Sequence, residues 1–196
     1  KNSNYLSYRS KVWQNTSRGG LPYFFLEDMS FEKYADFAIN MPLLFIYKNS
    51  KHIKSEGKTF KDFLDGNINI IQNSKPTYKD FETHLATIFT EVRLKKYIEV
   101  RSLDACEWSC HCSGPAFYTG LLYGNIDEVL EVIKNWKKKD VMNAYLEVPR
   151  NGLGVKINNK PIMYWSKILL NLAKKGLDKR NIKNKSKKNE SIFLKS

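Results

Sequence analysis

The amino-acid sequence predicts an α+β protein in which helices pack on a largely antiparallel sheet. Segments with strand periodicity come first along the chain, and segments with helix periodicity dominate its later part. A chain of 196 residues with 42% hydrophobic and 13% aromatic residues has enough apolar material for a proper core. This composition excludes a globally disordered protein.

Strand patterns occur in five segments. Residues 4–13 alternate, with Tyr5, Ser7, Arg9, Lys11 and Trp13 on one face. In residues 97–101 the alternation puts Tyr97, Glu99 and Arg101 on one face and Ile98 and Val100 on the other. The other three predicted strands are residues 21–27 after an SRGG turn, and residues 43–47 and 51–56 on either side of the polar turn KNS.

Capping residues predict where the helices begin. Ser30 precedes a helix over residues 31–41, and Thr59 with Asp62 starts a short helix that Gly66 ends. Thr77 with Asp80 starts a longer helix over residues 78–89. Three more helices are predicted later: a buried one over 115–124, one capped by Asn125 with Glu128 that turns Val129, Leu130, Ile133 and Trp136 inward, and one from Pro161 to Gly176 with Ile162, Trp165, Leu169 and Leu172 on one face.

The net charge of +13 is concentrated at the end of the chain. Residues 174–196 hold nine Lys or Arg against Asp178 and Glu190, which leaves +6 for the first 173 residues. We therefore predict one folded domain over residues 1–182, which the resemblance described below identifies as part of a catalytic domain, and a basic, mobile tail over residues 183–196. No nucleic-acid-binding motif is present, so no nucleic-acid partner is expected.

Neither a membrane partner nor secretion is predicted. No run approaches the roughly 20 apolar residues that cross a bilayer. The chain starts at Lys1 without a signal-peptide pattern, which leaves secretion unsupported, and without a starting Met, so we expect a further portion before it.

Cys106, Cys110 and Cys112 lie within seven positions, with His111 among them. An odd, crowded set is not typical of a secreted disulfide framework and favours a reducing cytoplasm. The four side chains are enough to fill a tetrahedral zinc site. Consecutive residues of an extended chain point in opposite directions, however, so a single site made from all four is not expected. A nucleophilic cysteine is not predicted, because neither His52 nor His84 lies in a sequence context typical of a cysteine protease.

The residue types alone leave two interpretations of Glu99 and Arg101 open. One is an exposed strand face with a weak ion pair. The other is a ligand-bearing face, where Glu99 binds Mg²⁺ through hard oxygen atoms and Arg101 binds an adjacent phosphate.

Several segments in order along the chain resemble glutamate–cysteine ligases of the plant and proteobacterial type. The resemblance covers nearly the whole chain and about the C-terminal half of such an enzyme. The segments are LSYRSKVW (6–13), GKTFKDFLDG (57–66), PTYKDFETHLATIFTEVRLKKYIEVRSLDACEW (76–108), GPAFYTGLLYG (114–124) and KKGLDKRN (174–181).

This resemblance implies a glutamine-synthetase-like carboxylate–amine ligase fold, of which the chain would be a partial domain. It implies ligation of the γ-carboxylate of glutamate to the amine of cysteine, the first step of glutathione synthesis. ATP is the expected phosphoryl donor and Mg²⁺ the expected cofactor. The missing N-terminal half of the enzyme is the expected partner, and the chain alone would be inactive or nearly so.

The resemblance also implies roles for individual residues. Glu99 would bind magnesium and Arg101 would contact the transferred phosphoryl group. Arg9 would pair with the carboxylate of bound glutamate, and Tyr97 would border the cysteine side. Trp13 and Trp108 would line the site or serve as core aromatics.

The chain departs from the plant pattern at SLDACE, where those enzymes have a glycine-rich stretch. Cys112 matches a cysteine that plant enzymes use in a regulatory disulfide, but its partner would lie in the absent half. Two alternatives stay open. The first is a non-catalytic chain, either the product of a split or decayed gene or a basic binding module. The second is a related ligase that uses another amine.

Overall fold

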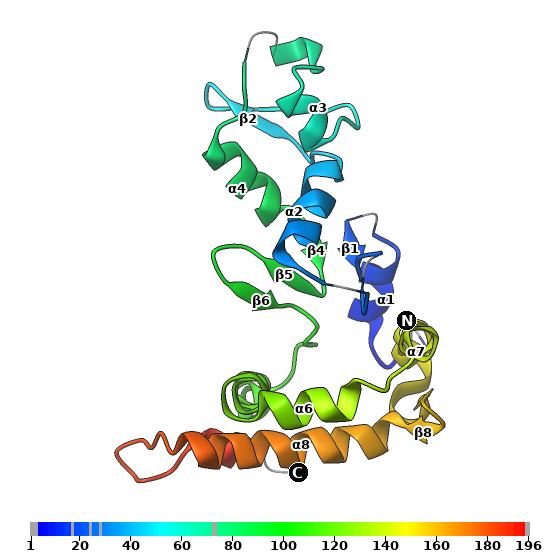
Figure 1. The fold of residues 1–196 in the computed structure, drawn as a ribbon, viewed down its shortest axis with the longest axis vertical. Coiled ribbons are helices and arrows are strands. Elements are labelled where there is room, and N and C mark those ends of the chain that lie inside the picture. The colour runs from blue at the N-terminus through cyan, green and yellow to red at the C-terminus, as the bar shows by residue number, and fades with distance from the viewer. Residues whose placement is uncertain (1–3, 17, 24, 28, 72–73, 195–196) are drawn as a thin grey trace. The chain divides into compact units, whose positions relative to one another are not determined.

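The structure is a computed structural model that describes residues 4–16, 18–23, 25–27, 29–71 and 74–194. The chain divides into two compact units. Figure 1 shows the ribbon coloured from blue at the N-terminus to red at the C-terminus. One unit combines Lys1–Lys11 with Leu103–Ser196, and the other is Val12–Ser102. Both contain helices and short strands, so the predicted α+β class is compatible with the structure.

Local capping signals account for the helices of the Val12–Ser102 unit. The Ser30 side chain accepts the Lys33 N–H, and capping boxes pair Thr59 with Asp62 and Thr77 with Asp80, as predicted. Gly66, at φ +76°, ends the short helix, because the Asn67 N–H then reaches the Asp62 carbonyl at 2.8 Å. These helices are α2 (Phe31–Asn40), α3 (Phe60–Leu64) and α4 (Tyr78–Ala86); a 3₁₀ turn covers Asn69–Ile71.

The strands form separate pairs instead of the single antiparallel sheet that was predicted. In the described residues, β2 (Ile46–Lys48) pairs with β3 (Lys51–Ile53) and β5 (Val92–Leu94) with β6 (Ile98–Val100), both antiparallel. A parallel pair joins β1 (Gly19–Gly20) to β4 (Phe89–Thr90). The core of this unit is Leu43, Ile46, Phe60, Phe63 and Ile68.

Two predicted strands are wrong. Helix α1 (Tyr8–Gln14) begins within the predicted strand over residues 4–13. Ser7 marks its start, because the Ser7 Oγ accepts the Ser10 N–H at 3.2 Å. The alternation in the sequence concealed this cap. Within residues 21–27, the described positions form turns and bends and no strand.

The other unit is mainly helical. Helix α5 (Ser113–Thr119) continues as a π-helix (Gly120–Gly124), followed by α6 (Ile126–Ile133). Helix α8 (Ile162–Arg180) runs beside α6 (Figure 1) and completes a core of Ala116, Leu121, Val129, Leu172, Ala173, Leu177 and Leu194. The remaining elements are η2 (Trp108–Cys110), α7 (Lys138–Asn151), η4 (Gly152–Gly154), the antiparallel pair β7 (Lys156–Ile157) and β8 (Lys160–Pro161), and η5 (Glu190–Phe193).

Several details of the predicted helices differ in this unit. Asn125 does not cap α6 with its side chain; its Nδ2 donates to the Leu172 carbonyl at 3.4 Å. Leu130 is 50% exposed, not inward. The sequence analysis did not predict α7.

Gly176 lies inside α8 and does not end it. A Cβ at Gly176 would overlap the Gly120 backbone, and one at Gly124 would overlap Gly176. The π-helix and α8 therefore approach backbone to backbone, which only glycine permits.

The predicted mobile tail has contacts of its own. Asn189 Nδ2 donates to Asp178 Oδ1 at 2.6 Å, Arg180 pairs with Glu190 at 3.6 Å, and Leu194 is 4% exposed. The described part of residues 183–196 thus folds back onto α8. The domain boundary after residue 182 stays a prediction.

Gly120→Ala is expected to destabilise the Leu103–Ser196 unit by about 1–3 kcal/mol, because the new methyl group would overlap the Ala173 carbonyl. Urea unfolding measures the change. Gly154→Ala is the matched control, since no atom lies within 4 Å of its added Cβ. Equal stability of the two variants would contradict the close packing.

Candidate active site

The hairpin of β5 and β6 gathers three charged side chains on one face. Its register puts Arg93 opposite Glu99. Residues directly opposite in an antiparallel pair share a face, as do residues two apart on a strand, so Arg101 joins them. The Arg101 N–H donates to the Glu91 carbonyl at 2.8 Å, which extends the pairing beyond β6.

The carboxylate of Glu99 lies between the two guanidinium groups. Arg93 Nε donates to Glu99 Oε2 at 2.7 Å, and its second terminal nitrogen lies 2.6 Å from the same oxygen. Arg101 is 3.6 Å from the other oxygen, Oε1. The Arg93 side chain is 8% exposed, Arg101 19% and Glu99 31%, so the cluster is open mainly at the carboxylate.

Two aromatic rings support the guanidinium groups. Arg101 lies 5.6 Å from the Trp13 ring centre and 5.3 Å from that of Phe89. Arg93 lies 5.8 Å from Phe89, and the two rings are 5.4 Å apart. Trp13 therefore packs beside Arg101, within the same unit.

Two guanidinium groups against one carboxylate leave the cluster with an excess positive charge. Partial burial strengthens the electrostatic interactions of such charges, because the effective dielectric constant there is lower than in water. The excess charge favours an anionic ligand such as a phosphate or carboxylate, which a planar guanidinium binds well. A hard cation could approach the accessible carboxylate oxygen together with such an anion, which would offset the positive charge.

The predicted site residues are divided between the two units. Tyr97 lies at the hairpin turn, 59% exposed, and its hydroxyl accepts from Lys95 Nζ at 3.3 Å. Arg9, partly buried on α1, and Trp108 belong to the other unit. Trp108 is 89% exposed and stacks on His111 at 5.8 Å, so it is not a core aromatic.

The cysteine cluster contains a disulfide that the sequence analysis did not predict. Cys106 is joined to Cys110, and Cys112 is an exposed free thiol. Within the described ranges, no three His, Cys, Asp or Glu side chains gather in a way that could hold a metal ion. Also within those ranges, no helix combines the length and apolarity needed to cross a membrane.

A group of polar contacts, in which Arg18 and His84 take part, surrounds the turn after α4. Arg18 donates to the Thr87 carbonyl at 2.7 Å and also to the Pro42 carbonyl. His84 is 3% exposed and its Nε2 lies 2.7 Å from the Ala38 carbonyl, so Nε2 carries the proton that it donates. These contacts fix the turn that leads into β4.

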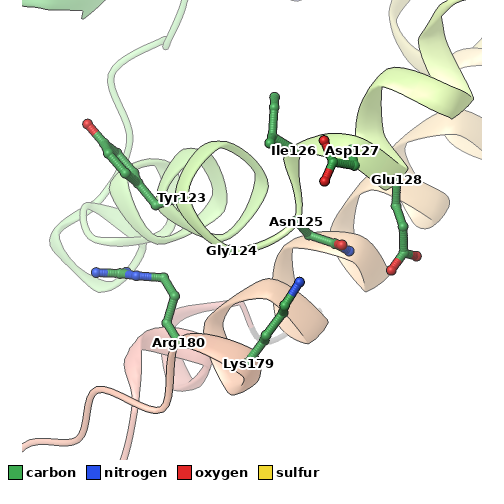
Figure 2. Close-up of a pocket in the computed structure, with 8 residues that line it drawn as sticks. All are labelled: Tyr123, Gly124, Asn125, Ile126, Asp127, Glu128, Lys179 and Arg180. Atoms are coloured by element: carbon green, nitrogen blue, oxygen red, sulfur yellow. The ribbon is translucent and has the colours of Figure 1, made fainter.

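A separate cavity of about 580 Å³ lies in the helical unit. Figure 2 shows Lys179 and Arg180 of α8 on one side, and Asp127 and Glu128 of the first turn of α6 on the other. Walls of both charge signs do not select an anion or a cation. Arg180 is also paired with Glu190.

Comparison with known proteins identifies the family of this chain. The model of glutamate-cysteine ligase family 2 matches residues 1–195. The chain belongs to this family. It is 37% identical over 188 residues to a chloroplastic glutamate–cysteine ligase of Solanum lycopersicum. The aligned region covers 93% of this chain and 36% of that protein. Similar ligases occur in Medicago truncatula (37% over 199 residues, 99% of this chain, 38% of the relative) and Arabidopsis thaliana (36% over 188 residues, 93% and 36%).

The predicted family is therefore confirmed. The chain spans a little over a third of the length of these relatives. The relatives are named as chloroplastic, and the predicted cytoplasmic location of this chain stays a prediction.

Sequence reasoning missed Arg93 and Phe89. A signal was present, because Val92, Arg93 and Leu94 alternate and a turn over Lys95–Tyr97 would set Arg93 opposite Glu99. That turn has no Gly, Asn or Pro to mark it.

His84 is expected to make stability depend on pH. Burial lowers its pKa from 6.5, the hydrogen bond to Ala38 opposes this, and the charge of Arg18 lowers it further. Below 6.5 the unfolded chain gains a proton that the folded one does not, so stability falls as pH falls until the lower folded pKa is reached.

Urea unfolding between about pH 5 and 7 measures this effect. The difference between the parent and His84→Phe isolates His84, because phenylalanine can stack on Phe60 as His84 does, at 5.2 Å, but does not titrate. Parallel pH curves for the two proteins would contradict the expectation.

Proposed function

We propose that this chain forms part of an ATP- and Mg²⁺-dependent glutamate–cysteine ligase in the first step of glutathione synthesis. The γ-carboxylate of glutamate accepts a phosphoryl group from ATP, and the cysteine amine then displaces phosphate. The position of Glu99 between Arg93 and Arg101, within the family-like segment YIEVRSLD, is the observation that carries the proposal.

In this proposal Arg101 stabilises negative charge on the transferred phosphoryl group. Its contacts with Trp13 and Phe89 hold the guanidinium in one orientation, so little reorganisation is needed when charge develops. Arg9 binds the glutamate carboxylate and Tyr97 borders cysteine. Trp13 supports Arg101 directly, and the exposed Trp108 lines the substrate side.

The carboxylate of Glu99 fits one magnesium position. Oε2 is held by Arg93, whereas Oε1 is 3.6 Å from Arg101, beyond hydrogen-bond distance, and can bind a hard cation. A bound Mg²⁺ would neutralise the phosphates of ATP. Since no cluster of three metal-binding side chains occurs in the described residues, the remaining ligands would come from water, ATP and another part of the ligase.

The proposal includes a glutamine-synthetase-like fold for the complete enzyme, to which the short strand pairs of this chain would contribute. The partner would be a missing N-terminal portion of the same enzyme, and this chain spans a little over a third of the length of its relatives. The chain alone would then be inactive. Cytoplasm remains the proposed location.

Glu99→Gln and Arg101→Ala are each expected to lower ligase activity by about 10²-fold or more, the scale of losing a preorganised charge contact. The assay is ATP hydrolysis that requires both glutamate and cysteine, in the full-length protein that contains this sequence. Supplying other free amino acids in place of the cysteine substrate in the same assay shows which amine the enzyme accepts.

The matched control is Glu56→Gln, which removes an exposed carboxylate from the same unit and should leave activity unchanged. Full activity in both site variants would exclude this site. A full-length parent without activity would favour the product of a split or decayed gene.

A further inference from the structure

Arg93 occupies a position that the proposed ligase reaction does not itself explain. It is 7% exposed, lies opposite Glu99 in the hairpin, and sends its guanidinium to that carboxylate. Burying a guanidinium without a partner is strongly unfavourable. The Glu99 contact is thus part of how Arg93 is accommodated.

The opposite edge of the Arg93 guanidinium is bound to the backbone. One terminal nitrogen donates to the Ala86 carbonyl at 2.6 Å and to the Ile88 carbonyl at 3.2 Å. Phe89 packs beside the group at 5.8 Å. Because these contacts hold the guanidinium in place independently of Glu99, we infer that Arg93 sets the orientation of the Glu99 carboxylate, and not the reverse.

The two oxygens of Glu99 are consequently unequal. Two nitrogens of Arg93 converge on Oε2, within 2.6–2.7 Å, and so use the two lone pairs that a carboxylate oxygen offers. Among the residues that the structure describes, Oε1 has only the 3.6 Å ion pair with Arg101. A cation that approached Oε2 would have to displace Arg93 from its carboxylate.

We propose that Arg93 is a positioning residue that holds Oε2 of Glu99 and presents Oε1, on the Arg101 side, as a single oxygen ligand for the divalent cation. Mg²⁺ tolerates little deviation from octahedral geometry, so the orientation of one carboxylate affects its affinity. This inference rests on the proposed magnesium role of Glu99.

The test measures Mn²⁺ binding by electron paramagnetic resonance in the full-length protein with a nonhydrolysable ATP analogue, alongside thermal unfolding. Arg93→Gln should weaken Mn²⁺ binding by about 10–100-fold, the usual effect of losing a residue that orients a metal ligand. Arg93→Lys keeps the charge without the planar fork and should show a smaller loss.

A double substitution separates positioning from a structural effect. In a Glu99→Gln background, Arg93→Gln should cause no further loss of Mn²⁺ affinity, because its effect acts through Glu99. Arg18→Gln is the matched control: Arg18 is also a buried arginine bound to a carbonyl of the 86–88 turn, but its hydrogen bonds go to Thr87 and Pro42. It should lower the melting temperature and leave Mn²⁺ affinity unchanged.

Each further outcome decides a different point. If Glu99→Gln weakens Mn²⁺ binding and neither Arg93 variant does, the positioning role is wrong while the magnesium role of Glu99 stands. If Glu99→Gln leaves Mn²⁺ binding unchanged, the magnesium role fails and the role of Arg93 fails with it. Equal losses for Arg18→Gln and Arg93→Gln would show that general destabilisation, and not positioning, controls the affinity.

Discussion

The charged cluster of the Val12–Ser102 unit depends on the pairing of one buried guanidinium, that of Arg93. Backbone carbonyls of the turn after α4 bind one edge of the group, and the Glu99 carboxylate binds the other. A buried charge must be matched within the fold, so Glu99 is needed there before any ligand arrives. In the proposed function, the same carboxylate would both balance the buried charge and bind the cation.

The segments that resemble the ligase family serve different physical purposes. Residues 76–108 build the hairpin and its charged face. Residues 114–124 and 174–181 instead bring the π-helix and α8 together through glycines, since side chains at Gly120 or Gly176 would meet backbone. A family-like motif is therefore no proof of contact with substrate; here glycine is required by the distance between two helices.

The confirmed capping boxes depend on neighbouring residues, whereas the missed partner of Glu99 is distant in sequence; local cap predictions still failed at Ser7 and Asn125. Thr59 with Asp62 and Thr77 with Asp80 act within one helical turn, and the structure confirms both capping boxes. Glu99 and Arg101 were found by strand alternation and family resemblance, but Arg93 required the hairpin register. Gly176 was misassigned because a helix end and a close helix contact both favour glycine.

The central claim is that Glu99 binds the divalent cation through Oε1 while Arg93 keeps Oε2. Its most direct test is a crystal structure of the full-length protein with Mg²⁺ and a nonhydrolysable ATP analogue, with Mn²⁺ used to locate the cation by anomalous scattering. The expected result is Mg²⁺ about 2.1 Å from Oε1, with both Arg93 contacts to Oε2 intact. A cation bound to Oε2 with Arg93 displaced, or one that does not contact Glu99, would contradict it.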